Sequence, residues 1–248
     1  MLKNIAKAII HKMGYLVIKN KLPSDIESDE EFISVLEKCK DYTMVAADRS
    51  YALFEAVKYV VGAAVPGDFV ECGVWRGGQS MLVAHTLIKL NQFDRTLWLF
   101  DTFAGMSRPT EQDVYLVTGE TAESLWEADK KDDHNNWCYA SLEEVQKNVS
   151  TTNYPKDKIN FVKGKVEDTI PKIMPEKISI LRLDTDFYES TYHELTHLFP
   201  RLEKGGVLII DDYGSWKGSK EAVDQYFKEN GIQMLLFRVG NGRFGIKV

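Results

Sequence analysis

Short apolar runs alternate with helically spaced segments along most of the chain after residue 66. The apolar runs are rich in Val, Ile, Leu and Phe and cover Asp68–Val74, Thr96–Thr102, Lys158–Val166, Lys177–Asp184 and Gly205–Asp212. Runs of this kind are typical of strands that are covered on both faces. The segments with helical spacing are Gly78–Leu90, Ser141–Ser150, Tyr188–Leu202 and Ser219–Asn230. This alternation predicts a mostly parallel sheet with crossover helices on both faces.

The pattern changes at the C-terminal end of the chain. Ile232–Val239 and Arg243–Val248 are strand-like runs separated by Gly240-Asn241-Gly242, which is a strong hairpin signal. We therefore predict an α/β fold with a doubly wound, mostly parallel, seven-stranded sheet and a C-terminal antiparallel hairpin. Five parallel strands followed by such a hairpin are typical of the Rossmann-like class I fold of S-adenosylmethionine-dependent methyltransferases, and not of dinucleotide dehydrogenases.

Residues 1–65 are expected to form a helical extension and cap that precede the sheet. Met1–Lys21 carries an apolar stripe and five lysines without one acid, which predicts a basic amphipathic helix. The stripe favours packing on the body of the protein or on a second copy of the chain, so we expect a homo-oligomer. Contact of this helix with a membrane surface is the less favoured alternative.

The rest of this region leads into the first strand. Leu22–Glu31 is predicted to be a connector, whereas Glu31–Cys39 and Ser50–Val65 have the spacing of helices. Pro66-Gly67 ends the cap. The cofactor-binding domain is therefore expected to span residues 66–248.

One long stretch, at about residues 104–137, resists assignment to a helix or strand. It contains several acids, Pro109 and two glycines, and it has little sustained periodicity. Loops this long in compact domains are usually functional or disordered. Because the stretch follows the second strand, it is expected above the carboxyl ends of the sheet, where ligands bind in open α/β folds. We predict that it is a substrate lid.

The composition narrows the classes of partner. The 248 residues are 44% hydrophobic, which suits one large domain, and the net charge of −6 argues against a nucleic-acid surface. Three scattered cysteines, at positions 39, 72 and 138, predict neither a disulfide framework nor a zinc site. No apolar run approaches the roughly 20 residues of a transmembrane helix. We expect a cytoplasmic protein that acts on a small molecule.

The first candidate site is a strand that turns through glycines into a helix. Gly73 and Gly77 let the backbone approach a ligand closely, and the helix that follows offers unpaired N–H groups to a carboxylate. Glu71 ends the strand and is suited to accept hydrogen bonds from an ammonium group. A zwitterionic amino-acid moiety fits this pair, so we predict cofactor binding by Glu71, Gly73, Trp75, Gly77 and Ser80.

A second acid closes the next strand. Asp101, followed by Thr102, lies where an acidic side chain can accept hydrogen bonds from both ribose hydroxyls of a nucleoside cofactor. The alternative is a helix cap or turn residue. The position at a strand end favours ribose binding.

Carboxylates also follow the fourth and fifth apolar runs. Adjacent strands end about 5 Å apart, so Asp184, Asp211 and Asp212 are expected to crowd at one edge of the cleft. A divalent cation relieves their repulsion, and hard oxygen ligands suit magnesium. Asp186 is left outside this set because it lies two residues past the strand end. The alternative is that these acids are surface turn residues.

Four segments together resemble the macrocin O-methyltransferase family of sugar methyltransferases. The segments begin at Glu71 (ECGVWRGG), Asp101 (DTFAGM), Leu183 (LDTDFYEST) and Ile209 (IIDDYG). The resemblance runs from about residue 42 to the C-terminus. It implies S-adenosylmethionine, a magnesium ion held by Asp184, Asp211 and Asp212, and a sugar or glycoside hydroxyl as methyl acceptor. It also implies that Thr43 and Met44 approach the cofactor.

The chemistry requires a base near the acceptor. Metal chelation by neighbouring sugar hydroxyls lowers the pKa of the attacking one and orients it. His134 in the predicted lid is the first candidate for the base, because neutral imidazole suits this task near pH 7. Asp184 is the alternative, as ligand and base at once.

Two other functions remain open at this stage. Asp184-Thr185-Asp186 is also a D-x-D motif, which a metal-dependent glycosyltransferase uses to hold the diphosphate of a nucleotide sugar. That function leaves the Asp211-Asp212 pair and the Glu71 glycine turn unexplained. The other alternative is a non-enzymatic interaction module that docks through the basic first helix.

Overall fold

One seven-stranded sheet organises the chain in the computed structural model, which describes residues 22–248. The strand order is β3-β2-β1-β4-β5-β7-β6. The strands are β1 (Asp68–Cys72), β2 (Leu97–Asp101), β3 (Ile159–Lys163), β4 (Ile178–Leu183), β5 (Leu202–Ile210), β6 (Phe237–Val239) and β7 (Gly242–Ile246). Strands β1 to β5 pair in parallel, whereas β7 pairs antiparallel with both β5 and β6. The predicted fold class is confirmed.

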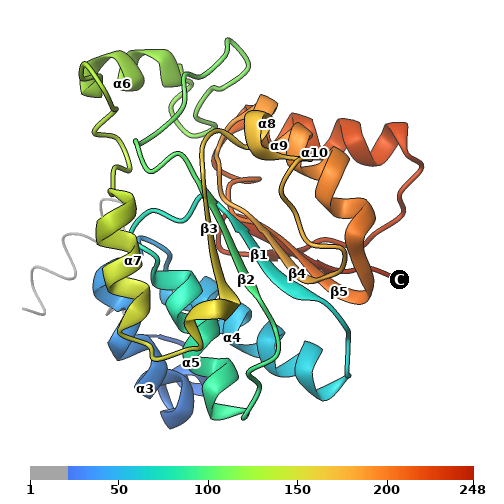
Figure 1. Cartoon of the computed structure of the whole chain (residues 1–248). Coiled ribbons are helices and arrows are strands. Elements are labelled where there is room, and N and C mark those ends of the chain that lie inside the picture. The colour runs from blue at the N-terminus through green and yellow to red at the C-terminus, as the bar shows by residue number, and fades with distance from the viewer. Residues whose placement is uncertain (1–21) are drawn as a thin grey trace, which may run out of the picture.

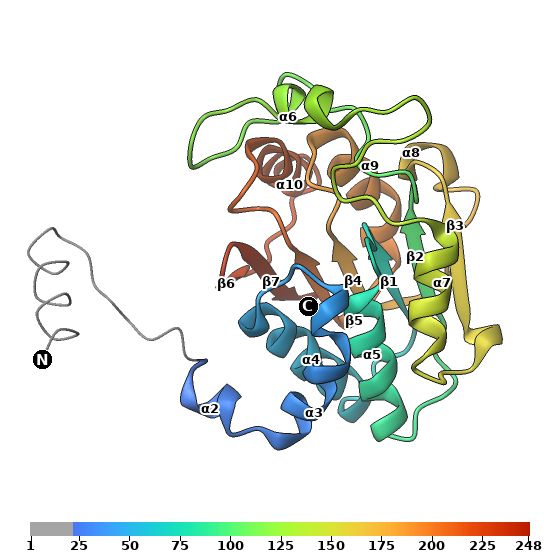
Figure 2. The same ribbon diagram turned by 90° about the vertical axis from the view of Figure 1, so that its left-hand side faces the viewer.

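Helices cover both faces of this sheet, as Figures 1 and 2 show. On one face the core includes residues from α3 (Glu30–Cys39), α4 (Ala47–Gly62), α5 (Gly78–Lys89) and α7 (Leu142–Ser150). On the other face it includes residues from α8 (Val166–Thr169), α9 (Tyr188–Leu198) and α10 (Lys217–Glu229). Short 3-10 turns occur at η1 (Lys40–Tyr42), η2 (Lys156–Lys158) and η3 (Phe199–Arg201). The strand order reverses between β1 and β4, where a doubly wound sheet leaves a crevice at its carboxyl edge.

Three local predictions differ from the structure. The predicted connector before residue 31 contains a short helix, α2 (Ser24–Glu27), and Ile26 of this helix is buried in the core. The first strand of the hairpin is only three residues long, because the preceding segment is not paired in the sheet. The predicted lid contains a helix, α6 (Ala122–Asp129). The predicted basic helix at Met1–Lys21, with its possible oligomer and membrane contacts, lies outside the described residues.

The lid lies over the carboxyl edge of the sheet, at the top of Figure 1. Asp113 anchors it: Oδ1 accepts a hydrogen bond from Tyr188 N at the start of α9 (2.8 Å), and Oδ2 accepts one from Thr110 N (2.7 Å). Leu116 N and Ser215 O form a backbone hydrogen bond of 2.8 Å. The segment is thus held against the loops that precede α9 and α10. None of the helices in residues 22–248 combines the length and the apolar character that a membrane-spanning segment requires.

Candidate active site

The alternation of side chains along three neighbouring strands brings four charged residues to one face. Glu71 on β1 lies beside Arg182 on β4, which lies beside Ile209 on β5. Asp184 and Asp211 follow two residues after Arg182 and Ile209, and residues two apart share a face of the sheet. The strand register therefore accounts for a cluster of three carboxylates around one guanidinium.

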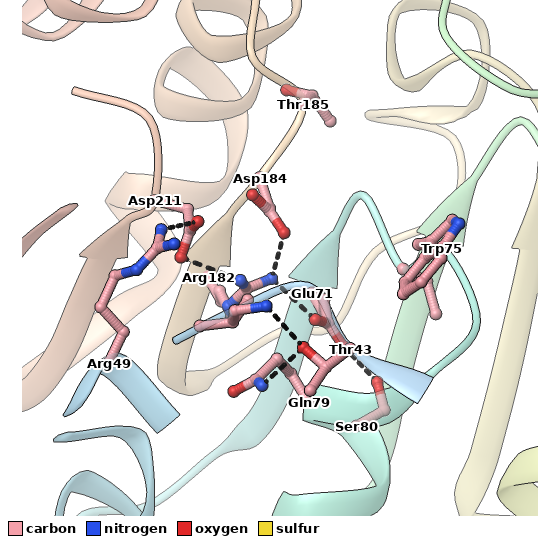
Figure 3. Close-up of polar contacts among 12 residues, drawn as sticks. Thr43, Arg49, Glu71, Trp75, Gln79, Ser80, Arg182, Asp184, Thr185 and Asp211 are labelled. Atoms are coloured by element: carbon pink, nitrogen blue, oxygen red, sulfur yellow. Dashed lines mark hydrogen bonds and ion pairs between the residues drawn. The ribbon is translucent and has the colours of Figure 1, made fainter. Parts of the chain in front are cut away.

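Arg182 lies at the centre of this cluster and is 2% exposed (Figure 3). Its Nη1 donates to Glu71 Oε1 at 2.8 Å and to Asp184 Oδ2 at 2.7 Å, and its Nη2 donates to Asp211 Oδ1 at 2.9 Å. Burial alone lowers the pKa of a guanidinium, but the three carboxylates outweigh it and raise the pKa of Arg182. Arg49 reaches in from α4 and donates to Asp211 Oδ2. Both oxygens of Asp211 are therefore paired with arginines.

A second group of acids lies beside the first. Oxygen atoms of Asp184, Asp186 and Asp212 all lie within 4.8 Å of one another. Oδ2 of Asp212 is buried and has no hydrogen-bond partner among the described residues. Burial and mutual repulsion raise the pKa of Asp184 and Asp212, and burial raises that of Asp186 to about 7. Crowded, uncompensated oxygens with one orphaned atom fit a hard divalent cation.

The predicted ligands Asp184, Asp211 and Asp212 all line one cleft, and their identity as ligands stays a prediction. Asp184 and Asp212 belong to both the predicted set and the cluster in the structure. Asp186, which the prediction left out, is the third member in the structure, whereas Asp211 is held by Arg49 and Arg182. The turn after β4 carries Asp186 back toward the strand ends, with the residue in the left-handed conformation at φ 67°. Distance along the chain past the strand end was thus a poor guide to position.

The glycine turn after β1 lines the same site and packs against the backbone of Asp184. At Gly73 (φ 84°) a Cβ would collide with the backbone oxygen of Asp184, and Gly77 (φ 92°) begins α5 in the left-handed conformation. Asp101 closes this turn, because its Oδ2 accepts from Val74 N (2.7 Å) and Trp75 N (3.1 Å). Its Oδ1 accepts from Phe103 N (2.7 Å). Burial raises the pKa of Asp101, and these three N–H groups oppose that rise.

A cleft of about 330 Å³ lies between the glycine turn and the acids. Predicted residues that line it are Thr43, Met44, Glu71, Gly73, Trp75, Asp101, Asp184, Asp211 and Asp212. A smaller hollow of about 60 Å³ shares Gly73, Asp101 and Asp184 with this cleft and extends to Thr102 and to the loop after β3. Gly77 and Ser80 do not line either hollow. The hydroxyl of Ser80 is fully buried and donates to Glu71 Oε2, so Ser80 supports Glu71 from below.

Gln79 is a cleft residue that the sequence analysis missed. Its amide is 4% exposed, and Nε2 donates to Thr43 Oγ1 at 2.9 Å and to Ser50 Oγ at 3.0 Å. Oε1 has no partner among residues 22–248. Figure 3 shows that this contact joins the start of α5 to Thr43, in the segment before α4. A buried amide next to the glycine turn adds a polar group to this end of the cleft.

His134 does not lie in the cleft. It lines a separate outer hollow formed by lid residues 127–134. Its Nδ1 contacts Asp133 at 2.6 Å and its Nε2 contacts Asn136 at 3.0 Å, so both ring nitrogens are engaged within the loop. Asp133 raises the pKa of His134. These contacts argue against the predicted role as base, which the sequence placed on His134 only because imidazole is suited to the reaction.

Aromatic side chains form the roof of the cleft over the acids. Tyr115 and Trp137 come from the lid, Trp216 comes from the loop before α10, and all three line the cleft. Trp216 packs against Tyr115 and Trp137 with ring centroids 5.4 and 5.8 Å apart. The cleft is therefore lined by acids, by the glycine turn and by aromatic side chains.

Comparison with known proteins bears on this geometry. A family model described as Macrocin-O-methyltransferase (TylF) matches residues 34–243. A demethyldecarbamoylnovobiocin O-methyltransferase of Streptomyces niveus is 36% identical over 185 residues, which cover 75% of this chain and 67% of that protein. A mycinamicin III 3''-O-methyltransferase of Micromonospora griseorubida is 34% identical over 206 residues, which cover 83% and 76% of the two chains.

Solved structures agree with these relatives. The O-methyltransferase NovP matches with a TM-score of 0.74 at 32% identity, over 84% of this chain and 82% of that one. The calicheamicin methyltransferase CalS11 matches with a TM-score of 0.57 at 14% identity, over 94% and 95% of the two chains. The second likeness concerns the fold alone.

Proposed function

The chain belongs to the macrocin O-methyltransferase family, and from this membership we propose that it is an S-adenosylmethionine- and magnesium-dependent O-methyltransferase. The proposed acceptor is a hydroxyl of a sugar or of a glycosylated small molecule, as the family resemblance implies; the relatives named above are O-methyltransferases of demethyldecarbamoylnovobiocin and of mycinamicin III at its 3'' position. One observation carries the proposal: a glycine turn closed by Asp101 and a group of uncompensated acids line one cleft.

The cofactor fits the glycine side of the cleft. We assign its methionine end to Glu71, Gly73 and the segment at Thr43 and Met44, which lie together there. Glu71 contacts Arg182 and Ser80, but each carboxylate oxygen can accept two hydrogen bonds, so it retains capacity for an ammonium group. Asp101 is assigned to the ribose, because it borders both the cleft and the smaller hollow.

The metal ion fits the acidic side. We assign Asp184 and Asp212 as ligands, since the orphaned Oδ2 of Asp212 lacks any other partner in the described part of the chain. Asp186 is the third carboxylate in the structure. Asp211, the third ligand that the family resemblance implies, accepts one hydrogen bond on each oxygen, from Arg49 and Arg182, so a cation that it binds would share it with these arginines. A bound divalent cation supplies Lewis acidity, which lowers the pKa of an acceptor hydroxyl.

The residues of the chain then have two tasks, to remove a proton and to orient the acceptor. Asp184 is assigned as ligand and base at once: Arg182 binds its Oδ2, and the two lone pairs of Oδ1 serve the cation and the acceptor proton. The aromatic roof excludes water and holds the acceptor between the acids and the methyl donor.

Calorimetric titration with S-adenosylhomocysteine tests this function. We expect micromolar binding to the full-length protein, and at least about tenfold weaker binding to Asp101→Ala, which loses an acceptor of hydrogen bonds from the ribose. Asp157→Ala is the matched control, because Asp157 is an exposed acid before β3, at the amino edge of the sheet. Its affinity should equal that of the unchanged protein.

The rival glycosyltransferase function predicts the reverse. Titration of uridine diphosphate with Mn²⁺ should then give binding that depends on Asp186, and S-adenosylhomocysteine should not bind. The family membership and the glycine turn favour the methyltransferase. Absence of S-adenosylhomocysteine binding to the folded, unchanged protein would overturn the proposal.

A further inference from the structure

Arg182 is an unusual residue for its place in the fold. It lies in the middle of the sheet, on a strand whose other residues are all buried, and it is 2% exposed. Replacing buried ion pairs with apolar side chains of similar volume is often neutral or stabilising. Stability alone therefore does not account for a guanidinium at this position. The three carboxylates around it include residues assigned to the cofactor side and residues on the acidic side of the cleft.

The three carboxylates that contact Arg182 differ in their other partners. Glu71 lies on the cofactor side, beneath the glycine turn, and its other oxygen accepts from Ser80. Asp211 is paired a second time by Arg49. Asp184 is the exception, because it is shared between Arg182 and the uncompensated group with Asp186 and Asp212.

We propose that Arg182 is a positioning residue with opposite effects on the two ligands: it fixes Glu71 for the cofactor and restrains the affinity of the acids for cations. The inference rests on the proposed function. A fixed positive charge in contact with Asp184 repels a divalent cation that binds the same carboxylate, and this repulsion is strong in a buried site. The same charge holds Glu71 in the orientation that faces the cleft.

The effect of losing Arg182 on the two affinities distinguishes a positioning role from a purely structural one. Loss of a purely structural residue weakens both ligands together, because the site loosens. Loss of the Arg182 charge makes the net charge of the cluster more negative, so at a pH where the acids are ionised a divalent cation binds more tightly. The cofactor binds less tightly because Glu71 is released. The two affinities should therefore change in opposite directions.

Arg182→Gln in the full-length protein tests the proposal. Binding of Mn²⁺ is followed by the electron paramagnetic resonance signal of the free ion, and binding of S-adenosylhomocysteine is followed by calorimetry. We expect Mn²⁺ to bind at least about threefold more tightly. S-adenosylhomocysteine should bind about tenfold more weakly, as is usual when a supporting residue of a site is lost.

Two further variants control for charge and folding. Arg182→Lys keeps the charge, so its Mn²⁺ affinity should stay within about twofold of the unchanged protein, as Coulomb interaction at similar distance requires. In Glu71→Gln/Arg182→Gln one positive and one negative charge are removed together. This variant keeps the net charge of the cluster if Arg182→Gln alone fails to fold, and it should bind S-adenosylhomocysteine weakly but Mn²⁺ normally.

Parallel weakening of both ligands in folded Arg182→Gln would overturn the proposal, as would unchanged binding of both. Normal S-adenosylhomocysteine binding to the double variant would overturn it as well. Failure of the proposed function is a separate result, because it is seen as absence of S-adenosylhomocysteine binding to the unchanged protein.

Discussion

Two groups of acids lie side by side at the carboxyl edge of the sheet, and they differ in how their charge is balanced. Arginines contact Glu71 and Asp211 (Figure 3), whereas Asp186 and Asp212 have no basic partner in residues 22–248. Asp184 belongs to both groups. Partly buried carboxylates that crowd together without a counter-ion are costly, so the second group is the better candidate for binding an external cation.

The comparison also explains why burial does not by itself identify a ligand. Asp211 is more buried than Asp184, with side chains 7% and 24% exposed, yet Asp211 already has two arginines. The ligand candidates are distinguished by a carboxylate charge that no basic side chain balances. The clearest case is Asp212, whose Oδ2 has no hydrogen-bond partner among the described residues.

The largest effect is expected from removing a member of the uncompensated group. Asp212→Asn should weaken Mg²⁺ binding by at least about 100-fold, because a ligand is lost and the repulsion that favours the cation falls. The increase in melting temperature with added Mg²⁺ measures this loss. Asp157→Asn is the control and should keep the full increase. An undiminished response in Asp212→Asn would break the distinction between the two groups.

A direct contrast between the groups gives a smaller effect. Asp186→Asn should weaken Mg²⁺ binding about tenfold, and Asp211→Asn should weaken it less, since the arginines already occupy the latter. Mn²⁺ titration followed by electron paramagnetic resonance compares the two. The opposite order would show that the metal displaces Arg49 from Asp211 and that the ligand set implied by the family resemblance is correct.

The pH dependence of Mg²⁺ affinity also tests the role of Asp186 in the uncompensated group. The pKa of Asp186 is raised to about 7 in the folded chain, so this carboxyl is protonated below that pH and must lose its proton to bind a cation. Mg²⁺ affinity should therefore rise by about tenfold between pH 6 and pH 8. Without metal, this group lowers stability as the pH rises through 7, because its folded pKa lies above its unfolded one. Equal Mg²⁺ affinity at both pH values would contradict the account.

The smallest effect on Mg²⁺ binding is expected at Asp113, a third kind of buried acid. Asp113 is fully buried and is satisfied by N–H and O–H donors of Thr110 and Tyr188 rather than by a cation. Asp113→Asn should lower the free energy of unfolding by about 1–3 kcal/mol, because the amide nitrogen cannot accept a hydrogen bond from Thr110. Chemical denaturation measures this change, and Mg²⁺ binding should be unaltered. A large loss of Mg²⁺ binding would show that the lid controls the metal site.

The architecture followed from the sequence because apolar periodicity reports burial on one face or two. The five parallel strands and the hairpin at Gly240-Asn241-Gly242 were predicted within a few residues of their bounds. Helix α6 was missed because the lid packs through scattered contacts, such as those of Asp113 and Trp126, rather than through a regular apolar stripe.

The site was predicted only in part. Strand ends can be located from sequence, which is why Asp101, Asp184 and Asp212 were placed at the cleft. The pairing of Arg182 with three acids was not foreseen, although a charged residue inside an otherwise apolar strand is a signal that could have revealed it. Whether Asp186 and His134 lie in the cleft or outside it depends on the conformation of their loops, and the pattern of apolar and polar residues does not predict that conformation.

Crystals grown with S-adenosylhomocysteine and Mn²⁺ provide the most direct test of the central claim. Anomalous scattering locates the manganese without reference to the protein model. The account predicts a peak within coordination distance of Asp184 and Asp212, and the cofactor product between the glycine turn and Asp101. A manganese peak away from these two acids, or an empty glycine turn, would contradict it.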